Sequence, residues 1–192
     1  MQILRHNVST ITLIRHGPPA VSLRQRVAGH QFRQFVERYD AARVARASRP
    51  PRLAQQAVAG AARVVASHRP RATHTAELLG ASTPDLVDAR FREIEFPVDF
   101  SKHVCFSALT WTIIALSLWR LGYGDRCESF ALARQRARQA VDMLEDQTKQ
   151  GAVVLVAHCG INKLISKELR RRGWRGPRIP GIRHWDCTTY CR

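Results

Sequence analysis

The chain has 192 residues, which is enough for one domain with a substantial hydrophobic core. Its 45% hydrophobic and 24% charged residues are ordinary for a globular protein, which excludes a disordered or fibrous chain. The formal net charge of +16 is unusual, because 31 Lys and Arg residues stand against 15 Asp and Glu. It reflects either a genome rich in arginine codons or an anionic partner, and in both cases it attracts anionic substrates at low salt.

The sequence shows no signal of an exported or membrane-spanning protein. No basic and apolar leader opens the chain, and five cysteines are an odd number for a complete disulfide framework. The longest uncharged run, residues 104–119, is shorter than the roughly 20 apolar residues that a membrane span needs. We therefore expect a cytoplasmic protein in which this run is a buried helix, with a lid or a helix on a membrane surface as the alternatives.

Short apolar runs alternate with amphipathic segments along the chain. In order, we predict a strand at 11–14, helices at 29–43 and 55–63, a strand at 64–66, a helix at 71–79, an irregular segment at 91–100, helices at 104–119 and 127–149, a strand at 151–158, a helix at 161–172 and a strand at 183–190. The alternation predicts a three-layer α/β/α sandwich with a mainly parallel central sheet. We expect one domain over residues 1–192, with 1–10 as a loose N-terminal extension and 104–121 as an apolar helical insertion or lid.

Three of the predicted strands run directly into polar, chemically reactive residues. The residues that follow them are Arg15-His16-Gly17, then Ser67 with Arg69 and Arg71, and His158-Cys159-Gly160. Ligands of open α/β sheets bind beyond the carboxyl ends of the strands, where helix N-termini add backbone N–H groups. If the strands are parallel neighbours, two histidines and at least two arginines converge there. This arrangement predicts a phosphate pocket.

These motifs resemble those of the histidine phosphatase superfamily, which has the phosphoglycerate mutase-like fold. The similar stretches are LIRHG at 13–17, the pattern S-x-x-x-R-A-x-x-T-A at 67–76, and VVLVAH at 153–158, with a glutamate between the second and third. They come in the family's order, and the resemblance runs from about residue 11 to 190. The chain lacks the His-Asp pair of the acid phosphatase branch at His158, which disfavours that branch.

The resemblance implies a role for each motif residue. His16 would be the nucleophile that forms a phosphohistidine, and this chemistry needs a neutral imidazole aimed at phosphorus. Arg15 and Arg71 would hold the phosphate oxygens, and His158 would be the second catalytic and phosphate-binding histidine of the pocket. Glu93 would protonate the leaving alkoxide and then activate water. No metal or other cofactor is implied, because positive side chains neutralise the transferring group.

Some assignments keep competitors. Arg69 competes with Arg71, although spacing favours Arg71, and Glu95 competes with Glu93 because both would share one face of an extended segment. The chain also departs from the family at two places. Cys159 replaces the usual glycine after the second histidine, and Pro18-Pro19-Ala20 replace the polar residues that usually follow RHG. Gly17 is expected to let the backbone approach a phosphate closely.

Two further clusters have alternative interpretations. The spacing His184-x-x-Cys187-x-x-x-Cys191 allows a zinc site, but we favour a plain strand, on which the histidine faces away from the cysteines. The run RRRGWRGPR at 170–178 allows nucleic-acid binding with Trp174 as a stacking residue, but we favour a solvated cationic helix end.

The function predicted from the sequence is metal-independent hydrolysis of a small phosphate monoester through a phosphohistidine on His16. The alternatives are mutase-like phosphoryl transfer and a non-catalytic module that binds a phosphorylated or nucleic-acid partner. Nothing in the sequence specifies the substrate or the oligomeric state.

Overall fold

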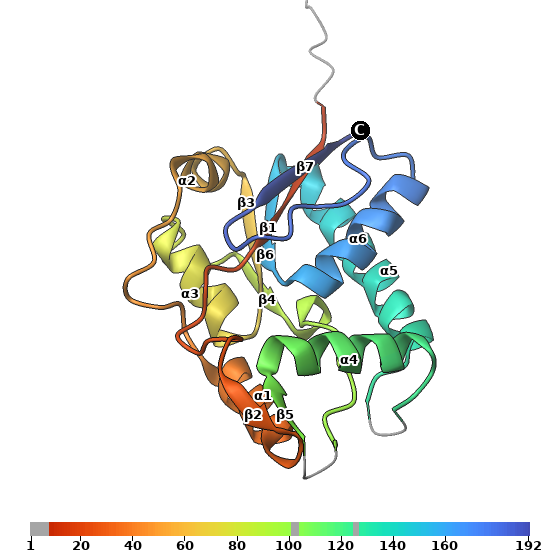
Figure 1. The fold of residues 1–192 in the computed structure, drawn as a ribbon. Helices are drawn as coiled ribbons and strands as arrows, with labels where there is room; N and C mark the ends of the chain where they lie inside the picture. Colours follow the sequence, from red (N-terminus) through yellow and green to blue (C-terminus); the bar gives the residue numbers. More distant parts are fainter. Residues whose placement is uncertain (1–7, 101–103, 125–126) are drawn as a thin grey trace, which may run out of the picture.

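Five strands form the main sheet of the molecule. The computed structural model describes residues 8–100, 104–124 and 127–192. The strands are β1 (Thr10–Arg15), β3 (Arg63–Ser67), β4 (Leu86–Asp88), β6 (Val153–Ala157) and β7 (Cys187–Cys191), in the order β4-β3-β6-β1-β7 (Figure 1). β4, β3, β6 and β1 are parallel neighbours, and β7 runs antiparallel to β1 at the edge. The predicted mainly parallel α/β sheet is confirmed.

The central strand β6 explains why both faces of the sheet carry helices. All five of its residues are buried, as expected for a strand covered on both sides. Val153 and Leu155 pack with α5 (Phe130–Gln147) and α6 (Cys159–Arg171), whereas Val154 and Val156 pack with α2 (Arg52–Ala59) and α3 (Pro70–Leu78). Figure 1 shows the two helix pairs on opposite sides of the sheet.

A smaller unit beyond the main sheet carries the apolar segment. β2 (Arg26–Ala28) pairs antiparallel with β5 (Cys105–Ser107), and α4 (Ala108–Arg120) follows directly (Figure 1). The Ser107 hydroxyl caps α4 by accepting from Thr110 N at 3.1 Å. Trp111 Nε1 donates to Val27 O at 2.8 Å and packs with residues of α1 (Phe32–Ala41). α4 is therefore fastened both to β2 and to the aromatic cluster beside α1.

The element boundaries differ from the prediction where strands are short. The helix expected at 104–119 begins only at Ala108, because Cys105–Ser107 are the partner strand of β2. The strand expected at 183–190 is β7 at Cys187–Cys191, and residues 183–186 form a turn instead. β2, β4 and β5 were not predicted, since three residues are too few to show an alternating pattern.

The N-terminal segment is described only in part. Residues 1–7 of the extension expected at 1–10 lie outside the described residues. Ser9 exchanges two backbone hydrogen bonds with Arg192, each 3.0 Å long, and Thr10 begins β1.

The basic cluster at 170–178 is packed against acidic side chains. Trp174 is buried, its Nε1 donates to Glu145 Oε1 at 2.8 Å, and the Arg192 guanidinium lies 4.9 Å above its ring. Arg172 forms ion pairs with carboxylates of α5 and α6. Trp174 therefore does not present a free ring for stacking on a nucleobase, while Arg170, Arg171, Arg175 and Arg178 are exposed, as expected for a solvated cationic helix end.

The length and apolar character of the helices can be compared with those of membrane spans. Among the described residues, none of the helices combines the length and the apolar character needed to cross a bilayer.

Candidate active site

The carboxyl ends of β1, β3 and β6 meet at one edge of the sheet and bring the predicted site residues together. Arg15 is in register with Ala157, the residue before His158. The rings of His16 and His158 lie 5.0 Å apart in an edge-to-face arrangement. Arg71, from the first turn of α3, donates from Nε to His16 Nε2 at 3.3 Å. Residues that are far apart in the sequence thus form one cluster.

His16 is buried and held in one tautomer. Its Nδ1 lies 2.8 Å from Gly17 O, and since a carbonyl only accepts, Nδ1 carries the proton. Nε2 therefore has a lone pair, which Arg71 faces. Burial, together with the nearby guanidinium groups of Arg71 and Arg15, holds the pKa of His16 well below its usual value. The ring is a neutral imidazole with one nucleophilic nitrogen turned toward cationic groups.

Arg71 is a buried cation that is held by the end of α1. Its side chain is 2% exposed, and Nη1 donates to Tyr39 O at 3.2 Å and Asp40 O at 3.3 Å. The Asp40 carboxylate pairs with Arg71 at 3.1 Å and with Arg69 at 3.0 Å. The Tyr39 ring stacks 5.0 Å from the Arg71 guanidinium. Asp40, a carboxylate that sequence reasoning did not identify, thus pairs with Arg71 and with its competitor Arg69.

Several nitrogen atoms at this edge are buried yet have no hydrogen-bond partner within the described residues. They are Arg15 Nε, Arg69 Nε, His158 Nδ1 and His184 Nε2. Buried polar groups are normally satisfied, so a group of unsatisfied nitrogens beside two arginines favours an anionic ligand at this position. The other end of the Arg15 side chain donates to Ile182 O.

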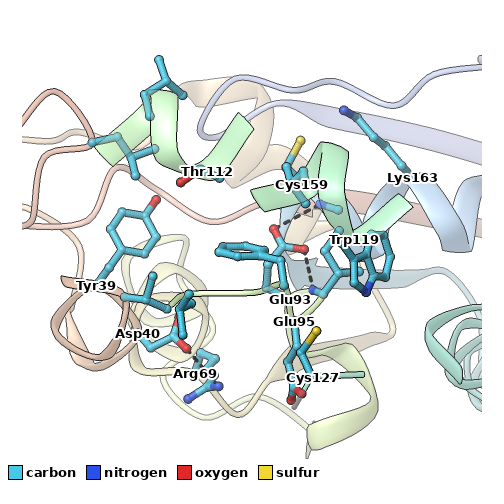
Figure 2. A pocket seen from close by; sticks show the side chains of 18 of the residues that line it. Tyr39, Asp40, Arg69, Glu93, Glu95, Thr112, Trp119, Cys127, Cys159 and Lys163 are labelled. Atoms are coloured by element: carbon cyan, nitrogen blue, oxygen red, sulfur yellow. Dashed lines mark hydrogen bonds and ion pairs between the residues drawn. The ribbon is translucent and has the colours of Figure 1, made fainter. Parts of the chain in front are cut away.

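His158 ends β6 and stands at the N-terminus of α6. Its Nε2 lies 2.9 Å from Ser67 Oγ, and the hydroxyl fixes the orientation of the ring. Burial and the neighbouring Arg71 guanidinium lower the pKa of His158, so this histidine is neutral as well. Cys159, which replaces the glycine usual in the family, is the first residue of α6, and its side chain lies at the cavity (Figure 2).

Glu93 is distinguished from Glu95 by its contacts. The Glu93 carboxylate accepts from Gly160 N at 3.1 Å and Ile161 N at 3.0 Å, at the positive end of the α6 dipole (Figure 2). A Cβ on residue 160 would come within 2.5 Å of Glu93 Oε1, so the glycine makes this approach sterically accessible. Glu95 instead pairs with Arg92 at 3.2 Å. Both glutamates line the cavity, but only Glu93 is attached to the helix that follows His158.

A buried ion pair holds the loop that carries Glu93. Arg136 of α5 pairs with Glu128 at 2.6 Å and donates to the carbonyls of Arg90 and Arg92, each at 2.8 Å. The irregular segment predicted at 91–100 is thus fixed by the side chain of another element, which explains how a loop without regular structure places a carboxylate.

His184 is a site residue that sequence reasoning missed. Its ring centroid lies 5.4 Å from that of His16, and burial with the nearby Arg15 charge lowers its pKa to about 4. The antiparallel course of β7 explains this position, because Cys187 pairs with Ile14 and the preceding turn reaches the carboxyl end of β1. The zinc alternative is not supported: within the described ranges, His, Cys, Asp and Glu form no group of three able to hold a metal ion.

The same turn changes the interpretation of Gly17. A Cβ at this position would lie 2.3 Å from the Trp185 ring, and Trp185 itself has a φ of 69°. Gly17 is therefore required by the packing of an indole, whatever its distance from a phosphate. Its backbone N donates to Thr75 Oγ1 at 2.9 Å, which ties the RHG segment to α3.

The proline segment after RHG is paired with the segment that follows α1. Pro18 O accepts from Ala45 N at 2.8 Å, and Ala20 N donates to Arg43 O at 2.9 Å. The prolines thus stand in an antiparallel contact whose bridge joins Pro19 to Val44. This contact keeps the loop beside the end of α1, from which Asp40 reaches the two arginines.

A cavity of about 550 Å³ opens in front of these groups. Its polar end contains Arg15, His16, Arg69, Arg71 and Glu93, and Figure 2 shows Glu93 between Arg69 on one side and Trp119 on the other. This volume lies in the range of small-molecule sites, so the cavity can hold much more than a phosphate ion.

The three neutral histidines predict that acid destabilises the fold. The pKa values of His16, His158 and His184 are lowered in the folded chain, so below pH 6.5 the unfolded chain binds protons that the folded chain does not. The free energy of unfolding should therefore decrease as the pH falls from 6.5 to about 4, the pKa of His184.

Urea denaturation across this window at constant ionic strength measures the slope. His184→Gln should reduce it, whereas the matched change at the exposed His30 should not. An unchanged slope in His184→Gln would contradict the assignment.

Known structures share this fold. An open reading frame of Mycobacterium tuberculosis gives a TM-score of 0.62 at 18% identity, covering 94% of this chain and 89% of that one. A mycobacterial glucosyl-3-phosphoglycerate phosphatase gives 0.61 at 21% identity, with 95% and 89% covered. YhfR of Bacillus stearothermophilus gives 0.56 at 24% identity, with 84% and 80% covered. Among curated proteins, none matches this chain in sequence.

The family assignment rests on the sequence itself. Residues 11–188 match the histidine phosphatase superfamily (branch 1). The matched range includes β1 and the RHG segment, the arginines of α3, Glu93 and the end of β6, which are the parts that meet at the cavity. The chain belongs to branch 1 of the histidine phosphatase superfamily.

Proposed function

We propose that the protein is a phosphatase that hydrolyses a phosphate monoester through a phosphohistidine on His16. The observation that carries this proposal is the buried, neutral His16, whose Nε2 lone pair faces Arg71 while Nδ1–H is held by Gly17 O. A nucleophilic nitrogen with a fixed tautomer, surrounded by guanidinium groups, has the geometry and the charge that in-line attack on a phosphoryl group needs.

In the first step, His16 Nε2 forms a bond to phosphorus while the bond from phosphorus to the alcohol oxygen breaks. Arg71 Nε, which donates to this nitrogen in the structure, turns to a phosphoryl oxygen. Arg15 supplies further positive charge and His158 a further polar group at the same edge. These groups stabilise charge that spreads over the oxygens in the transition state. The leaving alkoxide takes a proton from Glu93 or from solvent.

In the second step, water attacks the phosphohistidine and the bond from phosphorus to nitrogen breaks. Glu93 accepts the proton of this water, and inorganic phosphate leaves with His16 restored. The Glu93 carboxylate accepts hydrogen bonds from three backbone N–H groups, those of residues 94, 160 and 161, so it is held in place as an acceptor.

Two alternatives are weaker. Mutase-like transfer would need groups that retain the substrate between steps, and no contact of the described residues favours such a role. A non-catalytic binding module would not need a fixed neutral imidazole beside a carboxylate. The structural likeness to a glucosyl-3-phosphoglycerate phosphatase supports the reaction class, although at 21% identity it says nothing about the substrate of this chain.

Replacing the nucleophile should abolish turnover. Wild-type protein should hydrolyse p-nitrophenyl phosphate without added metal, and vanadate should inhibit it as a transition-state analogue. His16→Ala should lower kcat by roughly 10⁴-fold or more, as the loss of a covalent nucleophile does in other enzymes. His30→Ala, at an exposed position, is the control. Full activity in a folded His16→Ala protein would refute the mechanism.

The two glutamates should separate in pre-steady-state kinetics. Since p-nitrophenolate leaves without protonation, Glu93→Gln should still form phosphohistidine but hydrolyse it about 10²- to 10⁴-fold more slowly. A burst of p-nitrophenol followed by slow turnover, with acid-labile phosphate on the protein, is the expected result. Glu95→Gln should behave as wild type. A burst in Glu95→Gln alone would transfer the role to Glu95.

Asp40 should weaken phosphate binding, because its carboxylate competes for Arg69 and Arg71. Asp40→Asn should lower the inhibition constant of inorganic phosphate by roughly fivefold to tenfold, the effect of removing about 1 kcal/mol of like-charge repulsion. It should also destabilise the phosphate-free protein, since Arg71 loses its counter-ion. Asp146→Asn, which removes an exposed ion pair, is the control. Unchanged phosphate inhibition would show that the carboxylate does not compete.

A further inference from the structure

The cavity continues from the phosphate end into a largely apolar compartment beneath α4. The apolar side chains that line this part are Leu23, Phe35, Val36, Phe96, Val98, Leu109, Leu116, Trp119, Phe130 and Leu164. A phosphate ion would leave most of this surface facing an unfilled space. The apolar lining therefore faces the alcohol part of the substrate, which is released when the phosphoryl group is transferred.

One face of α4 forms a wall of this compartment. Leu109, Thr112, Leu116 and Trp119 line the cavity, and their spacing of three or four residues places them on one side of the helix. Ile113 borders this side of the helix, but its side chain is 57% exposed and does not line the cavity. The anchor of Trp111 on Val27 O and the Ser107 cap hold this wall in place.

The polar lining residues away from the phosphate end lie mainly at the surface. Arg33 is exposed and paired with Asp99, and Arg120 and Lys163 are exposed as well. Thr112 contributes a hydroxyl to the interior (Figure 2), but that hydroxyl donates to Ala108 O at 2.8 Å. Tyr39 adds a second hydroxyl to the lining (Figure 2). Because most of the other lining side chains are apolar, a polyhydroxylated alcohol would lose more hydrogen bonds to water than it gains here, which disfavours such a substrate.

We propose that the substrates are phosphate monoesters of extended apolar alcohols, with the hydrocarbon part in the compartment under α4. This inference rests on the proposed phosphatase function. The phosphoryl group lies at His16, Arg15 and Arg71, and the chain of the alcohol runs along Val98, Leu116 and Trp119. Such an ester is either free in solution or part of a lipid, and the chemistry recognised is the same.

A series of n-alkyl phosphates tests the proposal with the whole protein. From ethyl to octyl phosphate, below the concentration at which they form micelles, kcat/KM should rise by on the order of threefold for each methylene that becomes buried. Glycerol 3-phosphate and glucose 6-phosphate should be poor substrates. Hydrolysis of ethyl phosphate with no increase along the series would overturn the substrate class and leave the phosphatase function intact.

Two variants of α4 connect the effect to the compartment. Leu116→Gln places an amide of similar size in the wall and should lower the ratio of kcat/KM for octyl to ethyl phosphate by on the order of tenfold. Ile113→Gln is the same kind of change on the exposed side and should leave the ratio unchanged. Val98→Thr, a nearly isosteric change in the opposing loop, replaces Leu116→Gln if circular dichroism shows that variant unfolded. The placement of the hydrocarbon chain under α4 would be contradicted if Leu116→Gln had the same octyl-to-ethyl ratio of kcat/KM as wild type. The same criterion applies to Val98→Thr where it replaces that variant.

Alkyl phosphonates separate failure of this inference from failure of the proposed function. Their carbon–phosphorus bond is not cleaved by His16, so calorimetry measures binding alone. Affinity that rises with chain length while no ester is hydrolysed would support the compartment and refute the phosphatase. Affinity that is independent of chain length would overturn the compartment, whatever the turnover.

Phosphatidic acid in phosphatidylcholine vesicles distinguishes the two sources. Hydrolysis of octyl phosphate alone identifies free esters as substrates, and hydrolysis in vesicles identifies lipids; either supports the proposed class. Cleavage of neither, while hydrophilic esters are hydrolysed, would overturn it.

Discussion

The buried guanidinium of Arg71 is the constraint on which the site depends. A cation with a 2% exposed side chain is tolerated only when its hydrogen bonds are satisfied and its charge is balanced. The carbonyls of Tyr39 and Asp40 and the Asp40 carboxylate do this, and they lie at the end of α1. The need to balance Arg71 therefore fixes α1 against α3. The Nε donor is directed to His16, so the neutral histidine belongs to the same set of contacts.

The charges around this cation also set the protonation state of the two histidines. Positive neighbours and burial keep His16 and His158 unprotonated, while Asp40 neutralises part of the excess. Local neutralisation also occurs away from the site, where Arg172 contacts three carboxylates on α5 and α6. The electrostatics of the site thus depend on local ion pairs, whereas the net charge of the chain acts mainly by attracting anions from a distance.

The sequence predicted those features that depend on continuous apolar runs and on the residues directly after them. β6 and the sheet edge at Arg15, His16 and His158 follow from such runs, because parallel strands bring their ends together. The three-residue strands β2, β4 and β5 carry no periodic signal. Asp40 and His184 were missed because each reaches the site through long-range pairing, of α1 with α3 and of β7 with β1. A pattern within a short window contains no information on such pairings.

The turn before β7 has a consequence for the order of assembly. Ile182 accepts from Arg15 across 167 positions, His184 lies beside His16, and Trp185 covers Gly17. Contacts between residues this far apart close large loops, so they form late in folding compared with local contacts. The packing around Arg15, His16 and Gly17 thus depends on the correct docking of the turn before β7, although that turn does not line the cavity itself.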